Sequence, residues 1–231
     1  MKSKIIQNMV ALTGAGISAE SGITTFRDSG GLWEQYDIME VASIDGWRKN
    51  PELMLRFYND RRKQLQEVEP NTAHRILAGL EKDFKVTVVT QNVDNLHERA
   101  GSSNIIHLHG ELTKARSSVD PDLIVDIGYR PIEWGEKASD GSQLRPHIVW
   151  FGEAVPMIEA AADAVSIADI LVIIGTSLNV YPAAGLVGYA NRKTPVYLID
   201  PNEVSGAGRN MTVIREKATV GMEKFREMIL D

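Results

Sequence analysis

The sequence has no cysteine among its 231 residues. This absence excludes disulfide bonds, zinc sites built from thiolates, iron–sulfur ligation and a cysteine nucleophile. Five histidines are present, but they are scattered and form no obvious metal-binding motif. A chain of this length can bury a full hydrophobic core without such covalent or metal crosslinks.

Long apolar runs and a strong charge imbalance are also missing. No stretch approaches the roughly 18 consecutive apolar residues of a membrane-spanning helix. Polar Gln7 and Asn8 interrupt the N-terminal segment too early for a signal peptide. The chain has 25 basic and 31 acidic residues, and its net charge of −6 gives no general attraction for nucleic acid. We therefore expect a cytoplasmic protein with no membrane or direct nucleic-acid partner.

Short runs rich in β-branched residues alternate with longer helical patterns along the chain. The runs predicted as strands are 9–13, 85–90, 104–108, 147–151, 169–174, 195–200 and 211–214. The stretches predicted as helices are 51–68, 71–82, 155–167, 180–191 and 217–230. This alternation is typical of an α/β fold with a doubly wound parallel sheet.

Two segments do not follow the alternation. Residues 28–70 show helical patterns without a strand, and residues 112–145 are rich in Ser, Asp, Gly and Pro. We interpret both as insertions that build a smaller lobe, while 1–27, 71–111 and 146–231 form the larger lobe. A cleft between the carboxyl edge of a sheet and such a lobe is a common place for a ligand.

A glycine-rich segment follows the first predicted strand and fits the pattern G-x-G-x-x-A. Gly14 allows a tight turn, Gly16 allows the backbone to approach a phosphate, and Ala19 is small enough for helix–strand packing. Backbone N–H groups at the start of the helix favour an anionic ligand. The spacing alone fits a simple glycine turn equally well, but the preceding strand favours a nucleotide site.

Two further strand ends carry groups suited to a nucleotide. Gly175-Thr176-Ser177 follows the most apolar strand, which suggests a ligand with two phosphates or with a phosphate and a ribose. Asp200 ends another strand, and its carboxylate can accept hydrogen bonds from ribose hydroxyls. A turn or cap before Pro201 is an equally good interpretation of Asp200.

Polar side chains also follow the second and third predicted strands. Gln91, Asn92 and Asp94 lie close together after the second strand, although an Asx-rich turn that caps a helix explains them too. His107 and His109 end the third strand and face the same side of an extended chain. A histidine with a pKa near neutrality is a natural general base.

Five motifs occur in series and span most of the chain. They are GAGISAESGITTFRDSGGLW (14–33), TQNVDNLHERAG (90–101), HLHGE (107–111), RPHIVWFGE (145–153) and GTSLNVYPAAGL (175–186). Together they resemble the sirtuins, which are NAD-dependent protein-lysine deacylases. The resemblance implies a single catalytic domain over residues 1–231, with a Rossmann lobe and a smaller lobe made by a helical insertion and a zinc-binding insertion.

The resemblance also implies the reaction and its residues. NAD and an acylated lysine of a protein meet in the cleft, the acyl group passes to ADP-ribose, and nicotinamide leaves. The residues implied to bind NAD are Gly14, Ala15, Gly16, Ser18, Phe26, Arg27, Gln91, Asn92, Asp94, Gly175, Thr176, Ser177 and Asp200. His109 is the implied catalytic base, Asn92 and Asp94 hold the nicotinamide carboxamide, and His107 is structural.

The implied peptide site has a feature that bears on the acyl group. The residues implied to contact substrate are Ala42, Tyr58, Arg61, Val149, Phe151, Gly152, Asn179 and Val180. Tyr58 and Arg61 are three apart on one helix face, and spacing alone predicts an exposed basic helix. In the resemblance they match the desuccinylase and demalonylase type of sirtuin, in which the pair reads a carboxylate and deacetylation persists. For Trp150 and Phe151, core packing is an alternative to substrate contact.

The sequence departs from the family in two places. The zinc insertion, residues 112–145, has none of the usual four cysteines, and Ser117, Ser118, Ser139 and Asp140 near those positions do not make a zinc site. We therefore predict no zinc and a lobe held by packing. The apolar residues available for this are Ile124, Val125, Ile127, Tyr129, Ile132 and Trp134. The second departure is Asp200, where the family usually has Asn.

Two other functions stay open at this level. An NAD glycohydrolase or mono-ADP-ribosyltransferase would use the same ribosyl chemistry with a different acceptor. A non-catalytic module that binds NAD or ADP-ribose is the other alternative. The implied peptide edges argue against the first, and His109, Asn92 and Asp94 argue against the second. The oligomeric state predicted is a monomer.

Overall fold

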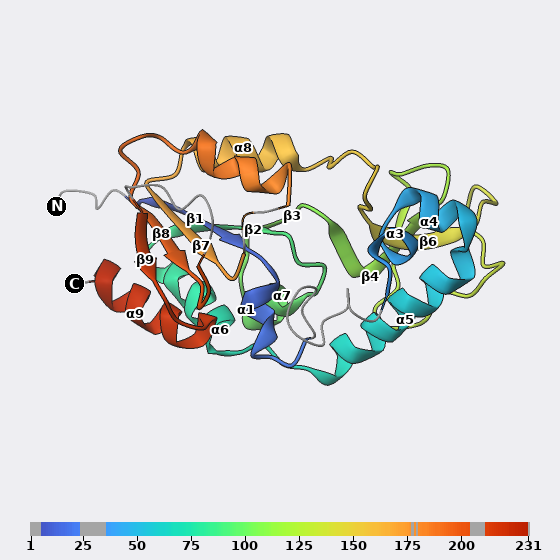
Figure 1. Ribbon diagram of the computed structural model, residues 1–231, viewed down its shortest axis with the longest axis horizontal. Coiled ribbons are helices and arrows are strands. Elements are labelled where there is room, and N and C mark those ends of the chain that lie inside the picture. Colours follow the sequence, from blue (N-terminus) through green and yellow to red (C-terminus); the bar gives the residue numbers. More distant parts are fainter. Residues whose placement is uncertain (1–5, 24–35, 177, 179, 204–210, 231) are drawn as a thin grey trace.

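The computed structural model describes residues 6–23, 36–176, 178, 180–203 and 211–230. Two sheets lie at opposite sides of the molecule (Figure 1): a six-stranded parallel sheet in the order β3-β2-β1-β7-β8-β9 and a three-stranded antiparallel sheet in the order β5-β4-β6. The predicted doubly wound parallel sheet is confirmed. The strands are β1 (Asn8–Thr13), β2 (Lys85–Thr90), β3 (Ile105–His107), β4 (Gly110–Ser117), β5 (Ile124–Asp126), β6 (Leu144–Ile148), β7 (Ile170–Ile174), β8 (Val196–Ile199) and β9 (Met211–Ile214).

Helices cover both faces of the parallel sheet because its strands are apolar on both sides. In β1, Met9 and Ala11 join the core under α6 and α9, while Val10 and Leu12 join the core under α8 and a 3₁₀ helix, η2. The helices are α1 (Ala15–Ala19), α3 (Ile38–Val41), α4 (Ile44–Lys49), α5 (Pro51–Glu67), α6 (Thr72–Gly79), η1 (Leu80–Lys82), α7 (Leu96–Ala100), α8 (Ile158–Ser166), η2 (Ala183–Tyr189) and α9 (Ala218–Leu230). Figure 1 shows α8 on one side of the sheet and α6 and α9 on the other.

The order of the strands creates a binding position. β1 lies between β2 and β7, so the chain leaves β1 and β7 toward opposite sides of the sheet. Gly14, Gln91 and Gly175 are the first residues after these three neighbouring strands. In open α/β sheets, ligands bind where the strand order reverses in this way.

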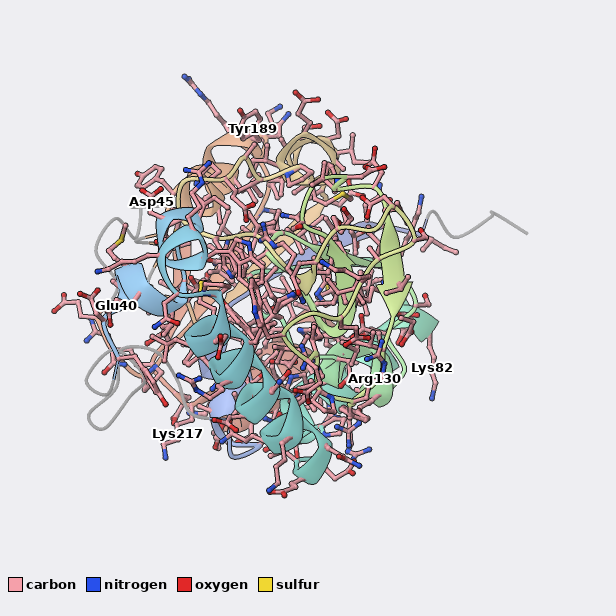
Figure 2. All side chains as sticks on the ribbon, turned by 90° about the vertical axis from the view of Figure 1, so that its right-hand side faces the viewer. Glu40, Asp45, Lys82, Arg130, Tyr189 and Lys217 are labelled. Atoms are coloured by element: carbon pink, nitrogen blue, oxygen red, sulfur yellow. The ribbon has the colours of Figure 1, made fainter. Side chains whose placement is uncertain are left out.

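The second sheet packs with α3, α4 and α5 at the far end of the molecule. Figure 2 looks onto this end, where the exposed Glu40 and Asp45 lie on the outer surface. α5 begins where the Asn50 side chain accepts a hydrogen bond from the Leu53 N–H, and Pro51 occupies its first turn. The apolar residues that fill the core between α5 and the sheet are Leu55, Ala115, Ile127, Ile132 and Leu144.

Three expectations about local structure need correction. The strand predicted at 147–151 is β6, which ends at Ile148 and pairs antiparallel with β4 rather than joining the parallel sheet. Residues 112–145 contain most of β4, together with β5 and the start of β6, where no strand was predicted. The helix predicted at 180–191 is a shorter 3₁₀ helix, Ala183–Tyr189. Short strands with polar residues on one face carry too weak an alternation to stand out in a sequence.

The packing prediction for the small lobe holds only in part. Ile127 and Ile132 are buried in its core, and Tyr129 is partly buried. Ile124, Val125 and Trp134 stay exposed, at 43%, 38% and 56%. β5 is one of the two edge strands of a small sheet, so few elements are available to cover it. Within the part of the chain that is described, no helix combines the length and the apolar character needed to cross a bilayer.

Candidate active site

A cavity of about 820 Å³ opens between the carboxyl ends of the parallel strands and the small lobe. Residues from both predicted lobes line it, as expected for a ligand site between them. The predicted site residues on its wall are Gly14, Ala15, Gly16, Ala42, Tyr58, Arg61, Gln91, Asn92, His109, Val149, Phe151, Gly152, Gly175, Thr176, Val180 and Asp200. Ser18 and Asp94 lie buried behind this wall. Phe26, Arg27, Ser177 and Asn179 fall outside the described residues.

The two glycine turns of the site pack directly against each other. The N–H of Gly14 donates to the Ile174 carbonyl, and the N–H of Gly16 donates to the Gly175 carbonyl. A Cβ on Gly16 would stand 2.6 Å from the Gly175 Cα, which no side chain tolerates. Gln91 Nε2 then donates to Thr176 Oγ1 over 3.1 Å, so the ends of β1, β2 and β7 form one connected surface.

Asn92 and Asp94 are held by a buried chain of hydrogen bonds. Asn92 Nδ2 donates to the Gly14 carbonyl and to Ser18 Oγ, each over 3.1 Å. Ser18 Oγ in turn donates to Asp94 Oδ2 over 3.0 Å, and Asp94 Oδ1 accepts from the Leu96 N–H. Burial raises the pKa of Asp94, and the bonds from Leu96 and Ser18 oppose that rise. Ser18 does not line the cavity itself, but its hydroxyl holds the Asn92 side chain, which does.

Two buried histidines beneath this chain were missed by the sequence reasoning. His97 Nε2 lies 3.0 Å from Thr13 Oγ1, and His74 Nε2 lies 3.4 Å from Ser18 Oγ. The two rings meet edge to face. Burial lowers the pKa of His74 to about 4 and that of His97 well below its usual value, so both stay neutral. Histidines inside ordinary helix patterns carry no sequence signal for such a role.

His107 and His109 have different partners despite their two-residue spacing. His109 lines the cavity, and its Nδ1 lies 3.0 Å from the Gln91 carbonyl. Since a carbonyl only accepts, Nδ1 carries the hydrogen and Nε2 of the neutral ring keeps its lone pair. Burial lowers the pKa of His109, partly offset by this hydrogen bond.

His107 is turned to a carboxylate instead. Its Nε2 lies 2.6 Å from Glu98 Oε1, and its Nδ1 lies 3.3 Å from the Asn92 carbonyl. Burial lowers the pKa of His107, but the Glu98 carboxylate outweighs it and raises the pKa above the usual value. His107 is not among the residues that line the cavity, and its ring is paired with Glu98. This geometry agrees with a structural role.

Tyr58 and Arg61 line the small-lobe side of the cavity, and both are buried. This differs from the exposed helix face that their spacing alone predicts. Tyr58 Oη accepts a hydrogen bond of 2.9 Å from the indole Nε1 of Trp150. Burial raises the pKa of Tyr58, so the hydroxyl keeps its hydrogen. Burial also lowers the pKa of Arg61, while Tyr58 and Asp94 favour its charged form.

One short segment connects these parts of the wall. The Val149 N–H donates to the His109 carbonyl, and the Phe151 N–H donates to the Ala42 carbonyl. Gly152 has a φ of +89°, which suits glycine and turns the chain after Phe151. Trp150 is 2% exposed and Phe151 is 44% exposed. Of the two aromatic residues, Trp150 therefore packs in the interior, while Phe151 reaches solvent at the cavity.

Asp200 lies on the wall and also forms a turn. Its Oδ1 accepts a hydrogen bond of 2.9 Å from the Asn202 N–H, as the turn interpretation expects. The side chain lines the cavity at the carboxyl end of β8. One carboxylate oxygen thus fixes the turn, and the other is the candidate acceptor for a ligand hydroxyl.

Comparisons with known proteins place this architecture in a family. A profile of the Sir2 family matches residues 14–182. An NAD-dependent protein deacylase of Bacteroides thetaiotaomicron is 58% identical, over 97% of this chain and 99% of that protein. A Sir2 homologue mutant in complex with ADP-ribose has a TM-score of 0.90 at 37% identity, covering 99% of this chain and 93% of that chain. A Sir2 homologue–NAD complex has a TM-score of 0.87 at 38% identity, covering 99% of this chain and 90% of that chain. The chain belongs to the Sir2 family.

Proposed function

We propose that this protein is an NAD-dependent protein-lysine deacylase that removes succinyl and malonyl groups, and also acetyl groups, from lysine side chains. One observation carries the proposal. A single cavity is lined by the glycine turns of the parallel sheet, by His109, and by the buried Tyr58–Arg61 pair. These are the parts needed to hold a dinucleotide, a proton acceptor and an acyl chain that ends in a carboxylate.

The wall at the parallel strands fits NAD. Gly14 and Gly16 bring backbone to the cavity without side chains, which is the surface that a pyrophosphate requires. Gln91, Asn92 and Asp200 add amide and carboxylate groups that can bond ribose hydroxyls and a carboxamide. NAD, when bound, supplies a ribosyl carbon with nicotinamide as leaving group and receives the acyl group.

His109 is suited to accept a proton in this reaction. The Gln91 carbonyl fixes the hydrogen on Nδ1, so the basic lone pair is on Nε2. The lowered pKa keeps the ring neutral and available at physiological pH. A positioned general base typically contributes about 10²–10⁴-fold to a rate.

The peptide that carries the acyl-lysine is expected to bind as an extended strand. Val149, Phe151, Gly152 and Val180 belong to two chain segments that line the cavity, and all four residues are at least partly exposed. Main-chain pairing along such segments gives affinity with little sequence preference. This arrangement favours an acylated lysine of a protein over a small molecule as the acyl donor.

The acyl preference follows from Tyr58 and Arg61. A guanidinium pairs with a carboxylate through two N–H donors, and a tyrosine hydroxyl adds another donor. Each hydrogen bond to a charged group is worth about 1.5–3 kcal/mol. The terminal carboxylate of a succinyl or malonyl group would use these donors, whereas an acetyl group offers them nothing.

A substrate panel tests the proposal. The full chain is incubated with NAD and one peptide carrying succinyl-, malonyl- or acetyl-lysine, and deacylated peptide and nicotinamide are both quantified. We expect the wild-type chain to deacylate all three peptides. When Tyr58→Phe is combined with Arg61→Met, activity on the succinyl and malonyl peptides should be lost, whereas deacetylation should be retained. Equal loss of all activities would contradict carboxylate reading. Nicotinamide without deacylated peptide indicates the glycohydrolase or ADP-ribosyltransferase alternative, and neither product indicates a binding module.

A further inference from the structure

We propose that Trp150 is a positioning residue that fixes the direction of the Tyr58 hydroxyl, and thereby makes the acyl end of the cavity a donor surface selective for carboxylates. The inference rests on the proposed function and adds the residue that sets its specificity. It starts from the contact between Trp150 Nε1 and Tyr58 Oη, 2.9 Å long and buried.

The direction of this hydrogen bond is set by chemistry. An indole N–H can only donate, so the Tyr58 oxygen is the acceptor. Conjugation keeps a phenol O–H near the plane of its ring, pointing to one of two sides. The indole occupies one side, and the Tyr58 hydrogen is therefore left on the other. Among the residues that the structure describes, no acceptor takes this hydrogen.

Several contacts hold the Trp150 ring in place and so fix the direction of its N–H. The guanidinium of Arg145 lies 3.4 Å from the centroid of the Trp150 ring. Arg145 donates to both carboxylate oxygens of Glu153, over 2.7 and 2.9 Å, and Glu153 Oε2 also accepts from the main-chain N–H of Trp150. Trp47 packs on the same indole at 5.4 Å between centroids. Rotating the indole would break its stacking on Arg145, its packing against Trp47 and its hydrogen bond to Tyr58.

The consequence concerns which acyl ends the pocket accepts. A Tyr58 hydroxyl that were free to rotate could donate or accept, so it would tolerate donor and acceptor groups alike. With the indole in place it can only donate toward the ligand, beside the guanidinium of Arg61 on the same wall. A carboxylate has acceptor atoms alone and satisfies both groups. The selectivity thus depends on Trp150 although the indole N–H points at Tyr58 rather than at the ligand.

The test compares kcat/KM for succinyl- and acetyl-lysine peptides in wild type, Trp150→Phe, Tyr58→Phe and the double variant. Trp150→Phe keeps an aromatic ring beside Arg145 and removes the indole N–H donor together with part of the ring. We expect the succinyl-to-acetyl ratio to fall about 5- to 20-fold, mainly through KM of the succinyl peptide, because one oriented hydrogen bond to a charge is weakened. In the double variant, the ratio should equal that of Tyr58→Phe alone, since Trp150 acts through Tyr58.

Other outcomes overturn the inference. A parallel loss of both activities in Trp150→Phe shows a purely structural role, and independent, multiplying effects of the two substitutions show that Trp150 does not act through Tyr58. Should Trp150→Phe fail to fold, Arg145→Lys loosens the stacked indole while keeping the charge, and the ratio should fall about 2- to 5-fold. An unchanged ratio contradicts the inference.

If wild type shows no preference for the succinyl peptide, or if Tyr58→Phe does not reduce that preference, the proposed function itself fails. This result is distinct from the outcomes that overturn only the role of Trp150.

Discussion

The two lobes build their sides of the cavity in different ways. In the large lobe, Gly14, Gln91 and Gly175 follow three adjacent buried strands, and backbone hydrogen bonds fix them. In the small lobe, a three-stranded sheet carries exposed apolar residues on its edge strand, Ile124 and Val125 among them. The parallel sheet thus carries the groups proposed for chemistry, whereas helix α5 of the small lobe carries Tyr58 and Arg61, which are proposed for acyl selection.

The small lobe is held at one point by a polar cluster near the positions where the family resemblance implies zinc ligands. Ser117 Oγ donates to Asp140 Oδ2 over 2.6 Å and lies 2.8 Å from Ser142 Oγ. The N–H groups of Val119 and Asp120 point to the same Ser117 oxygen. Hydrogen bonds around one buried hydroxyl thus connect the strand β4 to the two loops that follow β4 and precede β6.

The largest expected effect tests the chemical side of the comparison. His109→Ala removes the proposed proton acceptor from the large lobe, so deacylation of every acyl peptide should fall about 10²–10⁴-fold. NAD binding, measured by calorimetry, should persist because the glycine turns are unchanged. A His107→Gln variant is the matched control two residues away, and it should keep most of its turnover. Substantial turnover in purified His109→Ala would contradict the assignment.

A matched pair of core substitutions measures how firmly each lobe is packed. Ile173 in β7 and Ile132 in the small lobe are both buried, at 0% and 1% exposure. Ile173→Ala and Ile132→Ala should each lower the free energy of unfolding by about 2–5 kcal/mol, measured by urea denaturation. We expect the larger loss at Ile173. Helices cover both faces of its sheet, so the surrounding side chains have little freedom to fill the void that the substitution leaves. A larger loss at Ile132 would reverse the comparison.

The polar cluster gives a smaller effect that is confined to the small lobe. Ser117→Ala leaves the buried partners of the hydroxyl unsatisfied, which costs about 1–3 kcal/mol of stability. The exposed neighbour provides the control, because Ser118→Ala should stay within about 0.5 kcal/mol of wild type in thermal and urea unfolding. Adding a zinc chelator should change neither protein. A chelator-induced loss of stability would disprove the prediction that this lobe needs no zinc.

Much of the large lobe followed from sequence because its strands are continuous apolar runs. The β7 run and the motif at Gly14 predicted both the sheet and the turns that line the cavity. The small lobe was predicted less well. β5 is three residues long and exposed along its whole length, so no alternation marks it. The bounds of the short strands in the small lobe are set by pairing with residues elsewhere in the chain, and a local sequence pattern does not show this pairing.

The candidate site shows the same division. His109, Gln91 and Asn92 were predicted on the cavity wall from motifs, and the structure places them there. The link from Trp150 to Tyr58 joins residues 92 positions apart and has no sequence pattern. Partners of this kind are determined by how the lobes pack, so they become visible only in the folded chain.

The smallest expected effect concerns pH and compares the two histidines of one strand end. His109 is proposed to act in its neutral form, and burial lowers its pKa from the ordinary value of about 6.5, so the proposed base stays neutral to lower pH than a free imidazole. The acid limb of kcat/KM, which reports the free enzyme, should therefore have its midpoint below pH 6.5. His107, whose pKa Glu98 raises, would give a midpoint above that value if it were the base. A Glu98→Gln variant removes that influence and should leave the limb in place, whereas a shift toward lower pH would assign the titration to His107.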